Sequence, residues 1–106
     1  MIVVSDDKIA GMRVVHTLGL VRGNTIRARH LGKDVMAVLR NIVGGEVSEY
    51  TKMMAEAREQ ALDRMVAEAQ AVEADAVLDV QFGTSYVMAS AAEILAYGNA
   101  VKLEKL

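Results

Sequence analysis

The longest regular pattern in the sequence is an amphipathic helix that begins at Ser48 and continues for about 26 residues. Ser48 is the expected N-cap, because its hydroxyl can accept a hydrogen bond from a free backbone N–H of the first turn. At 1.5 Å per residue the helix would be about 39 Å long. We expect it to pack against a sheet through one apolar stripe, which recurs at spacings of three and four residues. The stripe consists of Tyr50, Met53, Met54, Ala57, Ala61, Met65, Ala69 and Val72.

Short stretches of alternating apolar residues predict strands on both sides of this helix. Gly23 and Asn24 tolerate a positive φ, so Arg22–Thr25 has the composition of a turn that leads into a second short strand. A shorter helix is expected before Gly44 and Gly45, which would end it. The predicted strands are Ile2–Val4, residues 12–21, a segment at Ile26 and Ala28, Asp75–Phe82 and Ala91–Leu103, and the shorter helix is Asp34–Val43.

The last of these strands is apolar on both faces. Ala96, Gly98 and Ala100 give one small, smooth face that suits a closely packed helix, whereas Leu95 and Tyr97 make the other face apolar too. One long helix covers only one face of a small sheet. We therefore expect the second face to be covered by another copy of the chain.

Composition narrows the class of protein further. The chain has 106 residues, which fits one domain over 1–106, and 53% of them are hydrophobic. Cysteine is absent, so disulfides and thiolate zinc sites are excluded. The N-terminus lacks the features of a signal peptide and no apolar run is long enough to span a membrane, so we expect a cytoplasmic protein. A net charge of −2 gives no general attraction to nucleic acid or to anionic membranes.

Several short motifs, in this order and spacing, resemble the YbjQ-like family over about residues 11–102. They are Asp34, Arg40-Asn41-Ile42-Val43-Gly44-Gly45, Tyr50, Ala57-Arg58, Ala61 and Ala74-Asp75-Ala76-Val77. The resemblance implies an α+β fold of the dodecin-like group, with an antiparallel sheet packed against one long and one short helix. It also implies a ring-shaped homo-oligomer, most simply a pentamer, and a heavy-metal-binding protein of unassigned function.

The chain departs from the family pattern at two positions. Glu73 and Asp79 stand where the family commonly has glycine. Glycine at the first position would fit the left-handed residue that closes a helix, and a glutamate there adopts that conformation at a cost of about 1 kcal/mol. Asp79 adds a carboxylate to a strand.

The candidate ligands for a divalent metal ion are His16 and His30. Further candidates are the carboxylates of Asp34, Glu46, Glu49, Asp75 and Asp79, and no pair has ligand spacing on one helix or strand. In a ring, one histidine from each copy could line a shared pore and complete a site by symmetry. The alternative is that His16 is a partly buried strand residue and His30 a surface turn residue.

Arg40, Gly44 and Gly45 form a candidate anion site. The glycines let the backbone approach a ligand closely, and the following helix offers free N–H groups and the positive end of its dipole. Arg40 could then bind phosphate or carboxylate in a bidentate manner. The alternative is an ordinary connection between two helices, in which the glycines cap and Arg40 pairs with a carboxylate.

No serine, histidine and acid occur in an order that indicates a catalytic triad, so we do not expect an enzyme. The leading interpretation is a homo-oligomeric protein that binds a small ligand or metal ion. A scaffold protein without a small ligand is the alternative, and an enzyme of unknown type comes third.

Overall fold

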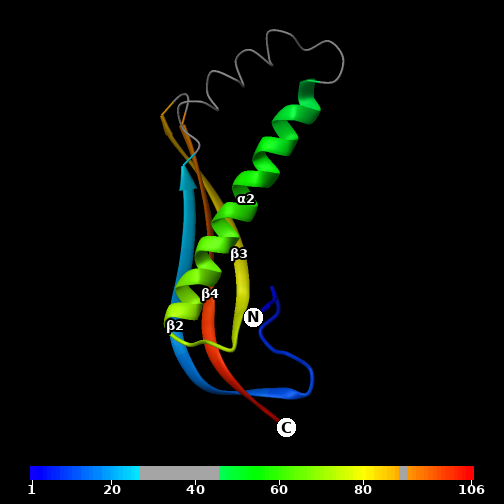
Figure 1. The fold of residues 1–106 in the computed structure, drawn as a ribbon, viewed down its shortest axis with the longest axis vertical. Coiled ribbons are helices and arrows are strands. Elements are labelled where there is room, and N and C mark those ends of the chain that lie inside the picture. Colours follow the sequence, from blue (N-terminus) through cyan, green and yellow to red (C-terminus); the bar gives the residue numbers. More distant parts are fainter. Residues whose placement is uncertain (27–45, 89–90) are drawn as a thin grey trace.

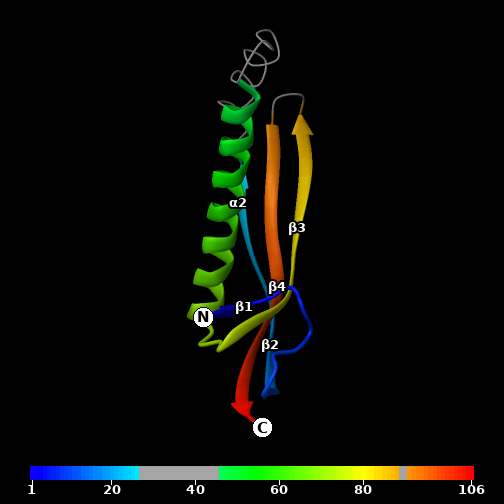
Figure 2. The same cartoon turned by 90° about the vertical axis from the view of Figure 1, so that its right-hand side faces the viewer.

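The computed structural model describes residues 1–26, 46–88 and 91–106. These residues form two layers, with one long helix, α2, lying along one face of a four-stranded sheet (Figures 1 and 2). The expected α+β architecture of a sheet and a long helix is therefore confirmed. Across the sheet the strands follow the order β1-β3-β4-β2. The elements are β1 (Ile2–Val3), β2 (Met12–Ile26), α2 (Glu46–Ala71), β3 (Ala76–Met88) and β4 (Ala91–Lys105).

The sheet is mixed, so the prediction of a purely antiparallel sheet is wrong. Strand β4 runs antiparallel to both β3 and β2, but β1 runs parallel to β3, with Ile2 opposite Ala76 and Val3 opposite Val77. Parallel neighbours need a long connection between them, and here the whole of β2 and α2 lies between β1 and β3 in the sequence. The predicted N-terminal strand is confirmed as β1, which lies at one edge of the sheet.

Strand β2 runs straight through the predicted turn at Arg22–Thr25, so that prediction is wrong. Arg22 lies opposite Tyr97, and the pairing with β4 continues to Ile26. A Cβ atom on Gly23 would lie 2.3 Å from the carbonyl oxygen of Ala61 and 2.3 Å from the amide nitrogen of Met65. Glycine is therefore needed at this position because α2 crosses β2 in direct backbone contact, not because the chain turns.

Helix α2 buries the middle of its predicted apolar stripe against the small face of β4, whereas Val72, the last predicted member, is exposed and lies beyond the end of the helix. Ala57, Ala61, Met65 and Ala69 are fully buried in one cluster with Val21, Val77, Ile94, Ala96 and Ala100. The opposite face carries Lys52, Glu56, Glu59, Asp63 and Glu68, which are exposed. The helix starts at Glu46, so Ser48 lies inside its first turn and the N-cap prediction is wrong. The predicted short helix Asp34–Val43 and the strand segment at Ala28 lie outside the described residues.

Glu73 closes α2 in the left-handed conformation, with φ of 61°, although it has a Cβ where the family commonly has glycine. The N–H of Ala74 donates to the carbonyl oxygen of Ala69 at 3.0 Å, and the N–H of Glu73 donates to that of Gln70 at 3.0 Å. These two bonds form a Schellman motif. The glutamate thus performs the capping role of a glycine while its Cβ keeps the conformation strained.

Strand β3 has its bulge at the second departure from glycine. Asp79 also has a positive φ, 53°, and the pairing of β3 with β4 shifts between Leu78 and Gln81. The strict alternation expected for Asp75–Phe82 is broken there, because the bulge adds a residue to β3. The N-terminal segment follows the bulge, since the N–H of Asp79 donates to the carbonyl oxygen of Asp6 at 2.9 Å.

The second face of the sheet is covered in part by the same chain. Ala76, Leu78 and Val101 form a second buried cluster on that face, and the N-terminal Val4 and Ile9 pack over it. The prediction that only another copy could cover this face is therefore wrong at the end of the sheet nearest the N-terminal segment. Further along, Leu20 remains 60% exposed.

The molecule is long and thin, and its core is built from small side chains. It measures 55 × 25 × 16 Å and has a Cα radius of gyration of 17.1 Å, where a compact domain of this length would have about 13 Å. In the described residues, Met65 and Val77 are the largest side chains that are fully buried. Such a core leaves much apolar surface uncovered, which favours association with another chain.

Candidate functional site

His16 lies on β2 with an exposed side chain, opposite Lys102 of β4. Lys102 forms an ion pair with Asp75, at 3.7 Å between Nζ and Oδ1. The positive charge of the lysine opposes the approach of a metal cation to the imidazole. His30 lies outside the described residues. Strand β2 continues through Gly23 and Asn24, so the chain does not turn there.

Metal-ligating side chains do not converge in the described part of the chain. Over residues 1–26, 46–88 and 91–106, no three His, Cys, Asp or Glu side chains are arranged to hold a metal ion. The predicted anion ligands Arg40, Gly44 and Gly45 lie outside these residues. Both predicted sites therefore stay predictions.

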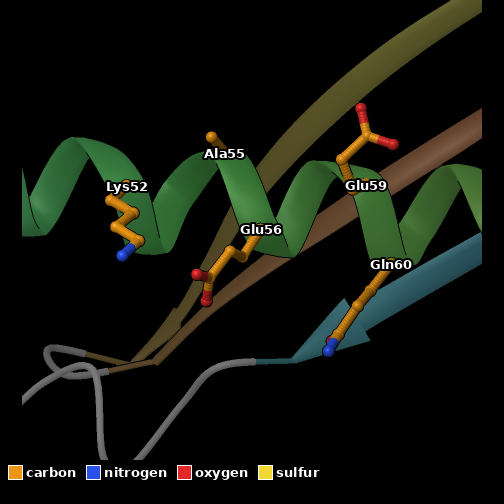
Figure 3. Close-up of a pocket in the computed structure, with 5 residues that line it drawn as sticks. All are labelled: Lys52, Ala55, Glu56, Glu59 and Gln60. Carbon is orange, nitrogen blue, oxygen red and sulfur yellow. The ribbon is translucent and has the colours of Figure 1, made fainter.

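A hollow of about 450 Å³ lies on the outer face of α2. Its lining residues are Lys52, Ala55, Glu56, Glu59 and Gln60, all from this one helix. Figure 3 shows Lys52, Glu56 and Gln60 pointing to one side of the helix, and Ala55 and Glu59 pointing to the other. The polar groups diverge, and the hollow lacks the enclosing walls that small-ligand pockets have. We therefore do not assign a ligand to it.

The most distinctive surface features of the described molecule are two open edges of the sheet. Strand β2 is the last in the sheet order, and its 15 residues have no neighbour on their outer side among the described residues. On the opposite edge, β1 pairs only with Ala76 and Val77 of β3. From Gln81 to Met88, β3 therefore also has no outer neighbour among the described residues. Open edges present unpaired backbone N–H and C=O groups that readily pair with another strand.

The β2 edge is strongly apolar. Several of its large side chains are exposed, namely Val14, Val15, Leu18 and Leu20. On the other edge, Phe82 of β3 is 49% exposed although it lies opposite the buried Ala96, because α2 packs mainly over β2 and β4. A long, flat and apolar edge is unfavourable in a monomer.

The two edges also carry opposite charges. Strand β2 contains Arg13 and Arg22 and no carboxylate, with Arg13 paired to Glu104 of β4, whereas β3 contains Asp79 and no cation. Asp6 and Asp7 lie beside the β3 bulge in the N-terminal segment. The backbone N–H of Asp7 donates to Oδ1 of Asp6 at 2.7 Å and holds the pKa of Asp6 below its usual value, so that carboxylate stays charged.

The sequence interpretation missed these edges because it assigned Arg22 to a turn. The available signal was composition, since the segment from Met12 to Ile26 contains cations and β-branched residues but no acid. If Gly23 had been interpreted as a position where a helix packs closely, the whole run from Met12 to Ile26 would have been predicted as one long strand.

The fold and its edges define a small α+β protein whose sheet, over the residues that the structure describes, has one open edge at β2 and one partly open edge at β3. The chain belongs to the YbjQ-like family, whose model matches residues 1–104 and is described as "Putative heavy-metal-binding". No helix in the described parts of the chain has the length and apolar character needed to cross a membrane.

Similar proteins extend over the whole chain. A UPF0145 protein of Methanosarcina acetivorans is 59% identical over 103 residues, covering 97% of both chains. A UPF0145 protein of Pseudothermotoga lettingae is 48% identical over 106 residues, covering 100% of both. A crystal structure of a DUF74-family protein of unknown function from Pediococcus pentosaceus matches with a TM-score of 0.66 at 13% identity, covering 98% of both chains. This last similarity shows the fold alone.

Proposed function

We propose that this protein works as a ring-shaped homo-oligomer that binds a small ligand or a metal ion. The observation that carries the proposal is the presence of two unlike open edges on one sheet. The edge formed by β2 is apolar and basic, and the edge formed by β3 and the N-terminal segment carries carboxylates.

Unlike edges favour head-to-tail association. When an edge of one copy binds a different edge of the next, the contact is heterologous, and such contacts close into a ring if the rotation between copies allows it. Pairing of β2 with the open part of a neighbour's β3, from Gln81 to Met88, would satisfy the open backbone groups of both strands along that stretch. Five copies is the number that the family resemblance implies.

The ligand part of the proposal has its support in the description of the family as heavy-metal-binding. In a ring, each copy contributes one His16, so several histidine side chains surround the symmetry axis and could together coordinate one metal ion. The second candidate is an anion at Arg40, Gly44 and Gly45, directly before the first described turn of α2.

Native mass spectra of the untagged protein, purified gently without chelator, test the proposal. A ring mass with an added integer number of metal ions or metabolite units supports it and identifies the ligand by mass. A ring without added mass, together with no thermal shift from a panel of divalent metals and phosphate, contradicts the ligand part and favours a scaffold protein. A monomer contradicts the ring.

The anion site has a separate test. Arg40→Ala should abolish the thermal stabilisation by phosphate if the guanidinium binds the anion. If Arg40 is structural, the variant lowers the melting temperature but keeps the phosphate-induced shift. A Gly45→Val change would not distinguish the two roles, because it damages the connection in either case.

A further inference from the structure

Arg64 extends from α2 to the edge of β2. Its Nη1 donates a hydrogen bond to the backbone carbonyl oxygen of Asn24 at 2.6 Å, and both residues are exposed. The two residues are 40 positions apart in the sequence, so this bond joins the helix to the strand. A hydrogen bond from a charged guanidinium is about twice as strong as one between neutral groups. Arg64 therefore binds this carbonyl more firmly than a neutral amide N–H would.

The carbonyl group of Asn24 points toward the open side of β2. On β4, the carbonyl oxygen of Val101 accepts from the N–H of Asp75, and the N–H of Leu103 donates to the carboxylate of Asp75. Both β4 residues thus direct their backbone groups toward β3. These directions alternate along a strand, so Leu95 faces β3 as well. Asn24 lies opposite Leu95, so its own N–H and C=O point away from β4 and belong to the open edge.

The close packing of α2 on β2 places Arg64 at this edge. The helix crosses the strand at Gly23, where an added Cβ would lie 2.7 Å from the carbonyl carbon of Arg64. The arginine side chain therefore starts next to the strand and needs only its own length to reach the outward carbonyl of Asn24. An added strand would lie about 4.8 Å from β2 and would offer its own N–H to that oxygen. The guanidinium occupies the place of that N–H.

The part of β2 before Asn24 differs from this guarded end. Among the residues that the structure describes, no side chain bonds to the backbone of β2 between Met12 and Gly23. Large apolar side chains are exposed along this part instead. They are Val14, Val15, Leu18 and Leu20. The apolar surface that needs a cover and the unoccupied backbone groups thus lie on the same part of the strand.

We propose that Arg64 blocks the C-terminal end of the β2 edge and confines strand addition by a second copy to the part of β2 before Asn24. The choice of a second copy as the partner rests on the proposed function, whereas the block rests on the bond between Arg64 and Asn24. Charged side chains at exposed edges are a common protection against uncontrolled strand pairing. The block would keep a ring from growing into larger assemblies through the remaining end of β2.

Arg64→Met tests the block, since methionine has a helix propensity close to that of arginine but no hydrogen-bond donor. Wild type and variant are compared by sedimentation velocity at equal concentration. The freed end of β2 should join assemblies to one another, so the weight-average mass of the variant should be about twofold or more above that of the wild type. Arg64→Lys keeps a charged donor and should keep most of the wild-type mass distribution.

Arg58→Met is the matched control. It removes an exposed arginine from the same helix and leaves the bond between Arg64 and Asn24 in place, so its mass should equal that of the wild type. Chemical denaturation with circular dichroism detection gives the unfolded fraction of each variant. Larger species that only follow the unfolded fraction, or that form equally in Arg58→Met, overturn the block.

The mass of the wild type alone decides the ring of the proposed function, and the difference between wild type and Arg64→Met decides the block. A monomeric wild type overturns the ring, and the block then stands only if Arg64→Met self-associates. An assembled wild type with the same mass distribution as Arg64→Met overturns the block and leaves the ring standing.

Discussion

Glu73 stores strain at the end of α2, because a residue with a Cβ occupies the left-handed position of a Schellman motif. Glu73→Gly should stabilise the fold by about 1 kcal/mol, since glycine adopts this φ without a steric penalty. Chemical denaturation with circular dichroism detection measures the change. Glu73→Ala is the matched control: it removes the charge, keeps the Cβ and should give little gain. Equal stabilisation by both variants would show that charge, not backbone strain, matters here.

At the scale of elements, the contact between α2 and β2 depends on the absence of a side chain at Gly23. Gly23→Ala would place a Cβ 2.3 Å from backbone atoms of Ala61 and Met65, and neither helix nor strand can yield locally. We expect a loss of about 3 kcal/mol of stability. The control is Gly83→Ala in β3, where a Cβ meets nothing within 4 Å. Comparable losses in both variants, measured by thermal unfolding, would contradict the assignment of Gly23 to helix packing.

The same elements show which features the sequence could predict. The buried middle of the α2 stripe and the small face of β4 follow from local periodicity, so they were predicted correctly. Capping rules left the geometry at Glu73 open, because they give only the cost of a residue with a Cβ at that position. The continuation of β2 through Arg22–Thr25 and the parallel β1 depend on contacts between distant segments. Glycine is favoured both in a turn and where a helix packs against a strand, so the residue type at position 23 does not distinguish the two. Only the closeness of the Ala61 backbone in the folded structure shows that Gly23 is a packing position.

The candidate sites were less predictable than the fold. Of the predicted ligands, His16 lies on an exposed strand beside Lys102, and the others lie outside the described residues. Histidine and glycine serve many roles, so single residues without spacing on one element carry little information about a ligand. The edges of the sheet, which carry the proposed function, become visible only when the strand order is known.

At the scale of the whole molecule, a thin sheet with an alanine-rich core should need a partner along its β2 edge. Leu20→Lys introduces a charge at a position that is 60% exposed, so it should disrupt association while leaving the fold of each copy intact. Val72→Lys is the control, because Val72 is also exposed but follows the end of α2 and does not belong to β2. Light scattering after size exclusion would measure both, and an unchanged assembly in the Leu20 variant would place the contact elsewhere.

The mass of the wild-type protein in solution tests the central claim most directly. Sedimentation equilibrium at several concentrations should give a mass that is an integer multiple, above two, of the 11.4 kDa chain. The multiple should be five if this protein has the number of subunits that the family resemblance implies. A closed ring should keep that mass over a wide range of concentration, because every edge is occupied. A mass of 11.4 kDa at all concentrations would contradict the account, since the apolar edge of β2 would then be stable in water on its own.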